Sequence, residues 1–271
     1  MNFIILRIFR INCCLSIGVS LHAPIRIATE KSVFAMPETG IGLFTDVGGS
    51  YFLSRVKDNI SYGLYLGVTG FRLKAKDLLK WGVATNYIET DKIPDLYEEV
   101  IKTVNADTTF EEIKAIVDNH SDNTGINDDF NKTIDYCFKP DSIHNIKARL
   151  EDVASGKVPG QDQEFAQKTL DKISKFSPIS CGVVVEQIRR GQSMSLAEAF
   201  VMEYGISQAF MDSGEFYEGV RALLIDRDNS PKWKNSSIDE ITDKDIETFF
   251  SRPEQLNLDL MGDYKDAITY K

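Results

Sequence analysis

The sequence predicts an α/β fold with short strands near its N-terminal end and a mostly helical second half. Short apolar runs flanked by turn residues precede residue 90, and apolar residues recur at helical spacing from Asp91 onward. The chain has 271 residues, 42% of them hydrophobic and 27% charged, which is the composition of a globular protein with a sizeable core. We therefore expect a β-containing part followed by a helical part.

Three short strands are expected in the first part. Residues 26–28 and 33–35 are extended runs on either side of a polar turn at 29–32, and residues 84–88 form a third run. Pro37 is expected to keep the chain extended beyond the second strand.

Helices are expected between these strands and throughout the second half. The Gly48-Gly49 step is predicted to open a helix, and two more helices are predicted over 62–69 and 74–81. In the second half, 196–210 is amphipathic and 156–163 is the clearest loop. Three helix starts are marked by two capping boxes and a proline at a first helical position: Thr108 with Glu111, Ser195 with Glu198, and Ser177-Pro178.

Two carboxylates form the most informative feature of the chain. Glu38 and Asp46 lie eight residues apart in an apolar, glycine-rich segment ending at Gly48-Gly49, and no Lys or Arg lies between Lys31 and Arg55. Carboxylates in apolar surroundings are typical of acid/base and nucleophilic sites, although a solvated loop with two ordinary acids has the same local pattern. The expected helix start after Gly48 adds backbone N–H groups that favour negative charge.

Charge and composition exclude several other classes of function. The formal net charge of −10 and a pI near 4.9 leave no basic excess for neutralising phosphates, so no direct nucleic-acid role is expected. The cysteines lack metal-ligand or paired spacing, which indicates a reducing compartment and no metal site: Cys13, Cys14, Cys137 and Cys181. The histidines lie far apart in sequence and are not expected to be catalytic: His22, His120 and His144.

The two ends of the chain carry less information. The first fifteen residues are apolar and basic, and the first acid is Glu30, a pattern compatible with a short organellar presequence that is poor in Ser. No run reaches the roughly 20 apolar residues of a membrane span. The last twenty residues are polar and expected to be loosely held.

The stretch 28–49, ATEKSVFAMPETGIGLFTDVGG, resembles the active-site segment of the 3-hydroxyisobutyryl-CoA hydrolases, a branch of the crotonase superfamily. Crotonase relatives generally share the Pro-Glu step, whereas the aspartate eight residues later is characteristic of the hydrolase branch. The resemblance covers about residues 17–250. Four further stretches match: LGVTGFRL at 66–73, MEYGISQA at 202–209, FYEGVRALLID at 216–226 and SPKW at 230–233.

This resemblance implies a partial crotonase-like ββα spiral core, and cleavage of the thioester of 3-hydroxyisobutyryl-CoA in mitochondrial valine breakdown. Carried over residue by residue, Glu38 and Asp46 fall on the two catalytic and substrate-binding carboxylates. Glu38 would act as nucleophile or base, and Asp46 would hold the substrate hydroxyl and help to position water. No separate cofactor is implied, because CoA is part of the substrate, and no CoA-binding residue is assigned. The implied partners are an acyl-CoA and further copies in a homo-oligomer.

The chain departs from the family before residue 17. A Gly-Gly-Gly run of the family, which supplies an oxyanion-hole N–H, is replaced here by Cys14-Leu15-Ser16. Residues 1–15 resemble nothing in the family, so we expect an incomplete gene model, which sequencing the 5′ end of the transcript would test. The predicted divisions are 1–15 as an atypical segment, 16–105 as the later part of the core, and 106–271 as a helical region. Since loss of one oxyanion donor costs about 10²–10³ in rate, negligible activity is expected for residues 1–271 alone.

Two alternatives stay open. An enoyl-CoA hydratase or isomerase would use a second glutamate where this chain has Gly18, and hydratases commonly have a small residue in place of Asp46. A non-catalytic role beside the mitochondrial small ribosomal subunit is implied by fungal members of the family.

Near residue 220, Arg221 is expected to pair with an acid at a helix joint. Lys232 and Trp233 are expected to pack on or cover the core rather than to contact CoA.

Overall fold

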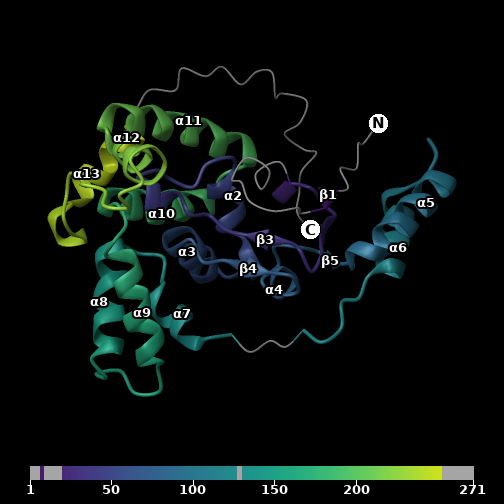
Figure 1. Cartoon of the computed structure of the whole chain (residues 1–271), viewed down its shortest axis with the longest axis horizontal. Helices are drawn as coiled ribbons and strands as arrows, with labels where there is room; N and C mark the ends of the chain where they lie inside the picture. The colour runs from purple at the N-terminus through teal and green to yellow at the C-terminus, as the bar shows by residue number, and fades with distance from the viewer. Residues whose placement is uncertain (1–6, 9–19, 127–129, 252–271) are drawn as a thin grey trace. The chain divides into compact units, whose positions relative to one another are not determined.

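The structure is a computed structural model that describes residues 7–8, 20–126 and 130–251 (Figure 1). The described chain divides into two compact units. Unit 1 contains residues 7–8, 20–35 and 72–126, and unit 2 contains residues 36–71 and 130–251. The units interleave along the sequence, whereas the predicted boundaries after residues 15 and 105 cut it into consecutive segments, so those boundaries stay a prediction.

Unit 1 holds the strands. A three-stranded parallel sheet has the order β1-β2-β5, and β3 pairs with β4 in an antiparallel ladder. Its elements are β1 (Arg7–Ile8), β2 (Arg26–Ala28), β3 (Val33–Phe34), β4 (Leu73–Lys74), α4 (Asp77–Lys80), β5 (Asn86–Tyr87), η3 (Thr90–Lys92), α5 (Ile93–Thr103) and α6 (Phe110–His120). Aliphatic side chains from β2, α5 and α6 form its core, including the buried Ile27, Leu96 and Val117. Helices α5 and α6 lie side by side in Figure 1.

The three predicted strands of this unit are confirmed, with β3 and β5 shorter than expected. Arg7–Ile8 pairs with β2 although it lies in the segment that resembles nothing in the family. One helix prediction is wrong: the start of the run 74–81 belongs to β4, and α4 is a single turn. Pairing with β3, some forty residues earlier, decides the conformation of Leu73–Lys74, and Ala75 at φ 48 then interrupts a helical path.

Unit 2 is helical. Helix α10 contacts α2, α3, α8 and α13, and α8 and α9 lie side by side (Figure 1). Its elements are η1 (Glu38–Ile41), α2 (Gly49–Leu53), η2 (Val56–Asp58), α3 (Ile60–Thr69), α7 (Lys132–Cys137), α8 (Ile143–Ala154), α9 (Gln163–Ile173), α10 (Pro178–Gly191), α11 (Leu196–Ser213), α12 (Glu215–Val220), the π-helical turn η4 (Arg221–Ile225), η5 (Ile238–Glu240), α13 (Asp243–Glu247) and η6 (Thr248–Phe250).

The helix-start signals were read correctly in two of three cases. Ser195 with Glu198 is a capping box and Pro178 occupies the first turn of α10. The box predicted at Thr108 lies one residue later, where Thr109 accepts from the Glu112 N–H. Because both pairs have the same spacing, the sequence pattern does not distinguish them. Among the described residues, no helix is long and apolar enough to cross a membrane.

The two cysteines in the described part of the chain, Cys137 and Cys181, are free and buried. Burial raises the pKa of the Cys137 thiol and of the Cys181 thiol to about 12 in each case. We therefore expect neither thiol to react with iodoacetamide at pH 8 in the native protein, since the thiolate is the reactive form. Peptide mass spectrometry measures each site separately, and labelling in denaturant is the control. Native labelling of either cysteine at the rate of a free thiol would contradict this packing. Cys13, Cys14 and the last twenty residues lie outside the described residues, as do the first fifteen residues apart from Arg7 and Ile8.

Candidate active site

Glu38 begins the 3-10 helix η1 and its side chain is 1% exposed. The prediction that Pro37 holds the junction extended is wrong. Pro37 has φ −86 and ψ 15, so the chain already turns there and leads directly into η1. The Glu38 carboxyl group is therefore shielded from bulk water. Electrostatic interactions in such a buried position are much stronger than at the surface.

Three helices hold η1 in place. The Thr39 hydroxyl donates to the carbonyl of Val68 near the end of α3, at 3.1 Å. The N–H of Ser177, the N-cap of α10, donates to the Thr39 carbonyl at 3.2 Å. Gly219 of α12 lies so close that an added Cβ would be 2.0 Å from the Ile41 carbonyl oxygen. The backbone beside Glu38 is therefore fixed by α3, α10 and α12 together.

Asp46 lies between η1 and α2. Its side chain is half-buried, and its Oδ1 has no hydrogen-bond partner among the described residues. Burial raises the pKa of the Asp46 carboxyl above its usual range. The next two residues, Val47 and Gly48, have φ 54 and φ 82. A β-branched residue at positive φ is strained by about 1–3 kcal/mol, and such strain persists only where the surroundings fix the conformation.

A buried polar network lies behind Asp46. Glu203 of α11 accepts hydrogen bonds from the Gly48 N–H at 2.7 Å, from the Ser50 N–H at 2.9 Å and from the Ser50 hydroxyl at 2.7 Å. Gln187 of α10 donates from Nε2 to the Thr45 carbonyl at 2.7 Å and contacts the Ser50 hydroxyl oxygen at 3.2 Å. Two helices therefore grip the backbone on both sides of Asp46.

The surroundings of Glu203 shift the pKa of its carboxyl group upward on balance. Burial raises the pKa of Glu203 to about 7, the hydrogen bonds from Gly48 and Ser50 oppose that shift, and the Asp46 charge adds to it. The coupling to Asp46 means that ionisation of one carboxyl disfavours ionisation of the other.

The helix start in this segment binds a carboxylate of the protein itself, in line with the expected preference for negative charge. Gly48-Gly49 does open a helix, α2, with Gly48 as its N-cap. The Gly48 and Ser50 N–H groups at this helix start donate to Glu203. These donors are satisfied within the protein, so this helix start does not offer them to a substrate anion.

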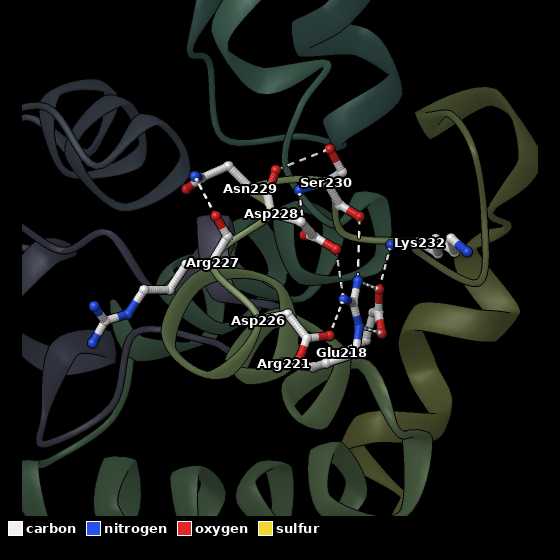
Figure 2. A network of polar contacts seen from close by, with 8 residues as sticks. All are labelled: Glu218, Arg221, Asp226, Arg227, Asp228, Asn229, Ser230 and Lys232. Atoms are coloured by element: carbon white, nitrogen blue, oxygen red, sulfur yellow. Dashed lines mark hydrogen bonds and ion pairs between the residues drawn. The ribbon is translucent and has the colours of Figure 1, made fainter.

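The joint near residue 220 has the opposite electrostatic character (Figure 2). Arg221 pairs with Glu218, Asp226 and Asp228, each at 2.7 Å, which confirms the predicted ion pairing at a helix joint. Arg221 lowers the pKa of Glu218 to about 2. The pKa of Asp46 is instead raised by burial, and no cation is among the described groups that shift it. The three carboxylates of this joint are thus held in ion pairs with one guanidinium group.

Lys232 and Trp233 follow this joint. The Lys232 backbone N–H donates to Glu218, while its exposed side chain points away from the carboxylates in Figure 2. Trp233 donates to the Lys175 carbonyl, and its ring lies 2.9 Å from where a Cβ on Gly42 would be. Trp233 thus packs beside the end of η1, as expected.

The histidines are engaged in local contacts. His120 Nε2 lies 2.7 Å from Glu99 Oε2, and His144 Nε2 lies 3.0 Å from the Ile241 carbonyl. The His22 Nδ1 is buried. Within the described ranges, no group of three His, Cys, Asp or Glu side chains is arranged to hold a metal ion.

Comparison with known proteins defines the class. Residues 16–250 match the family model described as enoyl-CoA hydratase/isomerase. The chain belongs to this family, and its crotonase-type fold is shared with solved structures. A carnitinyl-CoA dehydratase from Mycobacterium thermoresistibile aligns with a TM-score of 0.72 and 30% identity over 88% of this chain and 65% of the other. An enoyl-CoA hydratase from Rhodobacter sphaeroides aligns with a TM-score of 0.67 and 28% identity over 87% and 64%.

Curated relatives carry a more specific name. The protein named "3-hydroxyisobutyryl-CoA hydrolase, mitochondrial" in Gallus gallus is 42% identical over 235 residues, covering 86% of this chain and 60% of the relative. The protein of the same name in Danio rerio is 38% identical over 90% of this chain and 63% of the relative, and that in Homo sapiens is 38% identical over 86% and 59%. The chain thus spans about three fifths of the length of these relatives.

Sequence reasoning missed Glu203 and Gln187, which contact the candidate segment from 137 to 155 residues away. A signal for Glu203 was nevertheless present. It lies on the apolar stripe of α11 with Ala199, Ile206 and Phe210, all of which are buried. An acid in the middle of an apolar stripe requires buried polar partners, and those partners identify the segment it serves.

Proposed function

We propose that the protein containing this chain hydrolyses the thioester of 3-hydroxyisobutyryl-CoA, with Glu38 and Asp46 as its catalytic carboxylates. One observation carries the proposal. A buried and a half-buried carboxylate lie on a segment fixed by surrounding helices, in a chain whose curated relatives are named for this hydrolysis.

The chemistry has two routes that use the same residues. In the first, the Glu38 carboxylate takes a proton from water while the water oxygen bonds to the thioester carbonyl carbon. The tetrahedral intermediate then expels the CoA sulfur, which leaves with the proton, and the free acid remains. In the second, a Glu38 oxygen attacks that carbon and expels the CoA thiolate, and water then hydrolyses the mixed anhydride.

Asp46 has a different part in both routes. Its buried Oδ1 has hydrogen-bonding capacity that the described residues do not use. The 3-hydroxyl group of the substrate is a donor that would satisfy this oxygen, so Asp46 would fix the substrate and the attacking water. CoA enters as part of the substrate, and the proposal includes no separate cofactor or metal.

The same reading extends to the cellular setting. Because the curated relatives are named mitochondrial, we place the reaction in the mitochondrion, where it would serve valine breakdown. Two further predictions are self-association, which size-exclusion chromatography would test, and association with the mitochondrial ribosome, which co-sedimentation with ribosomal subunits would test.

The test compares two substrates on one protein. The extended chain is defined here as residues 17–271 preceded by the part of the Gallus gallus relative that lies before the matched segment. Free CoA release from 3-hydroxyisobutyryl-CoA is followed with a thiol reagent, and hydration of crotonyl-CoA by loss of its enoyl absorbance. We expect hydrolysis with little hydration. Efficient hydration without CoA release would instead support the enoyl-CoA hydratase alternative, and residues 1–271 alone serve as the low-activity comparison.

A further inference from the structure

We propose that Glu203 and Gln187 are positioning residues for Asp46, holding the backbone on either side of it. This inference rests on the proposed function only in giving Asp46 a catalytic role. The network itself is a property of the described chain.

The first argument is geometric. The Gln187 amide holds Thr45, the residue immediately before Asp46, and Glu203 holds Gly48 and Ser50, which follow it. The Ser50 hydroxyl joins the two, since it donates to Glu203 and lies within hydrogen-bonding distance of Gln187 Nε2. Little lateral freedom is left for the Asp46 backbone.

The second argument is burial. Gln187 and Ser50 are 0% exposed and Glu203 is 4% exposed. Desolvating a carboxylate is costly, and three hydrogen-bond donors offset only part of that cost. An apolar side chain at position 203 would avoid the cost but would leave the Gly48 and Ser50 N–H groups buried without acceptors. The Glu203 carboxylate accepts from the Gly48 N–H, next to the positive-φ residue Val47.

A third tie supports the same segment. The Phe44 ring stacks on the Phe210 ring of α11, with centroids 5.6 Å apart. Helix α11 therefore contacts the segment through an apolar pair before Asp46 and through a carboxylate after it.

Burial is the main cause that raises the pKa of Glu203, and the Asp46 charge adds to it. Among the described elements, α2, α12 and η6 pack most extensively against α11. The residues of η6 are Thr248, Phe249 and Phe250, which do not titrate in this range. In α12, Glu215 accepts from the Ser177 hydroxyl and from the Lys234 backbone N–H. Glu218 is paired with Arg221, and Tyr217 is exposed. In α2, Tyr51 lies against the Arg55 guanidinium.

The experiment uses residues 1–271 labelled for amide NMR. The Gly48 and Ser50 amide protons donate to Glu203, so their chemical shifts are expected to titrate with it, with a midpoint near 7. Removing the Asp46 charge with Asp46→Asn is expected to lower that midpoint, because an ionised Asp46 disfavours an ionised Glu203. Glu203→Gln is expected to abolish the titration.

The matched control is Glu215→Gln. Glu215 is also a carboxylate exposed by only 4%, but its partners are Ser177 and Lys234. This variant is expected to leave the Gly48 and Ser50 titrations unchanged. If Glu203 were only a structural cap, the midpoint of the Gly48 and Ser50 titrations would stay the same in Asp46→Asn. An unshifted midpoint in Asp46→Asn therefore overturns the proposal.

A variant that unfolds does not leave the question open, because the wild-type titration and the Asp46→Asn shift decide it without any change at position 203. The outcome is also independent of catalysis. An absent titration or shift refutes the positioning role, whereas absence of CoA release by the extended chain refutes the proposed function alone.

Discussion

Glu38→Gln in the extended chain is expected to lower kcat for 3-hydroxyisobutyryl-CoA hydrolysis by about 10²–10⁴-fold, the usual contribution of a positioned base or nucleophile. The amide has nearly the same shape as the carboxylate, so the packing around this 1% exposed side chain is kept. What is lost is the negatively charged oxygen that takes the proton or forms the acyl intermediate, because the neutral amide oxygen is a far weaker base and nucleophile. Steady-state CoA release measures kcat, and circular dichroism verifies the fold.

The control for that variant is Glu98→Gln, which makes the same change on the exposed face of α5 and is expected to leave kcat unchanged.

A second comparison distinguishes the role of Asp46 from that of Glu38. Asp46→Asn is expected to reduce hydrolysis of 3-hydroxyisobutyryl-CoA about 10–100-fold more than hydrolysis of isobutyryl-CoA, since only the first substrate offers a hydroxyl to Asp46. Equal losses on both substrates would rule out that contact.

Gly63→Ala is expected to destabilise residues 1–271 by about 3 kcal/mol or more, at the upper end of the cost of overpacking. A Cβ on Gly63 of α3 would lie 1.7 Å from the Leu53 carbonyl oxygen at the end of α2. Because that obstacle is backbone, the two helices must separate. The Val68 carbonyl, which accepts from Thr39 beside Glu38, lies on the same helix.

Gly67→Ala is the matched substitution on the same helix. Its Cβ would meet side-chain atoms only, with Ile188 Cδ1 at 2.8 Å and Leu53 Cδ1 and Val184 Cγ1 at 3.1 Å. Side chains can shift, and Ala gains about 1 kcal/mol of helix propensity over Gly. Urea unfolding is therefore expected to show a clearly smaller loss for Gly67→Ala. Equal midpoints for the two variants would contradict the close approach of α2 and α3.

The candidate carboxylates could be predicted from sequence because their signal is local. Glu38 and Asp46 lie on one segment, bounded by a proline and a glycine pair that punctuate the backbone. Local signals also located α3, α11 and the three predicted strands. Their failures share a cause: the pairing of β4 with β3 and the turn at Pro37 depend on contacts or dihedral angles that the local pattern does not specify.

The support of the site could not be predicted in the same way. Gln187 and Glu203 reach the segment from α10 and α11, more than 130 residues away. Which segment a buried polar side chain contacts depends on tertiary packing. Periodicity shows at most that Glu203 interrupts an apolar stripe. The oxygen atoms of an active site can thus be apparent in a sequence while the side chains that orient them are not.

The proposed thioester hydrolysis is tested by measuring CoA release from saturating 3-hydroxyisobutyryl-CoA by the extended chain beside its Glu38→Gln variant. We expect steady release by the first protein and a rate lower by about 10²–10⁴-fold in the second. Equal release by the two folded proteins would contradict the proposal.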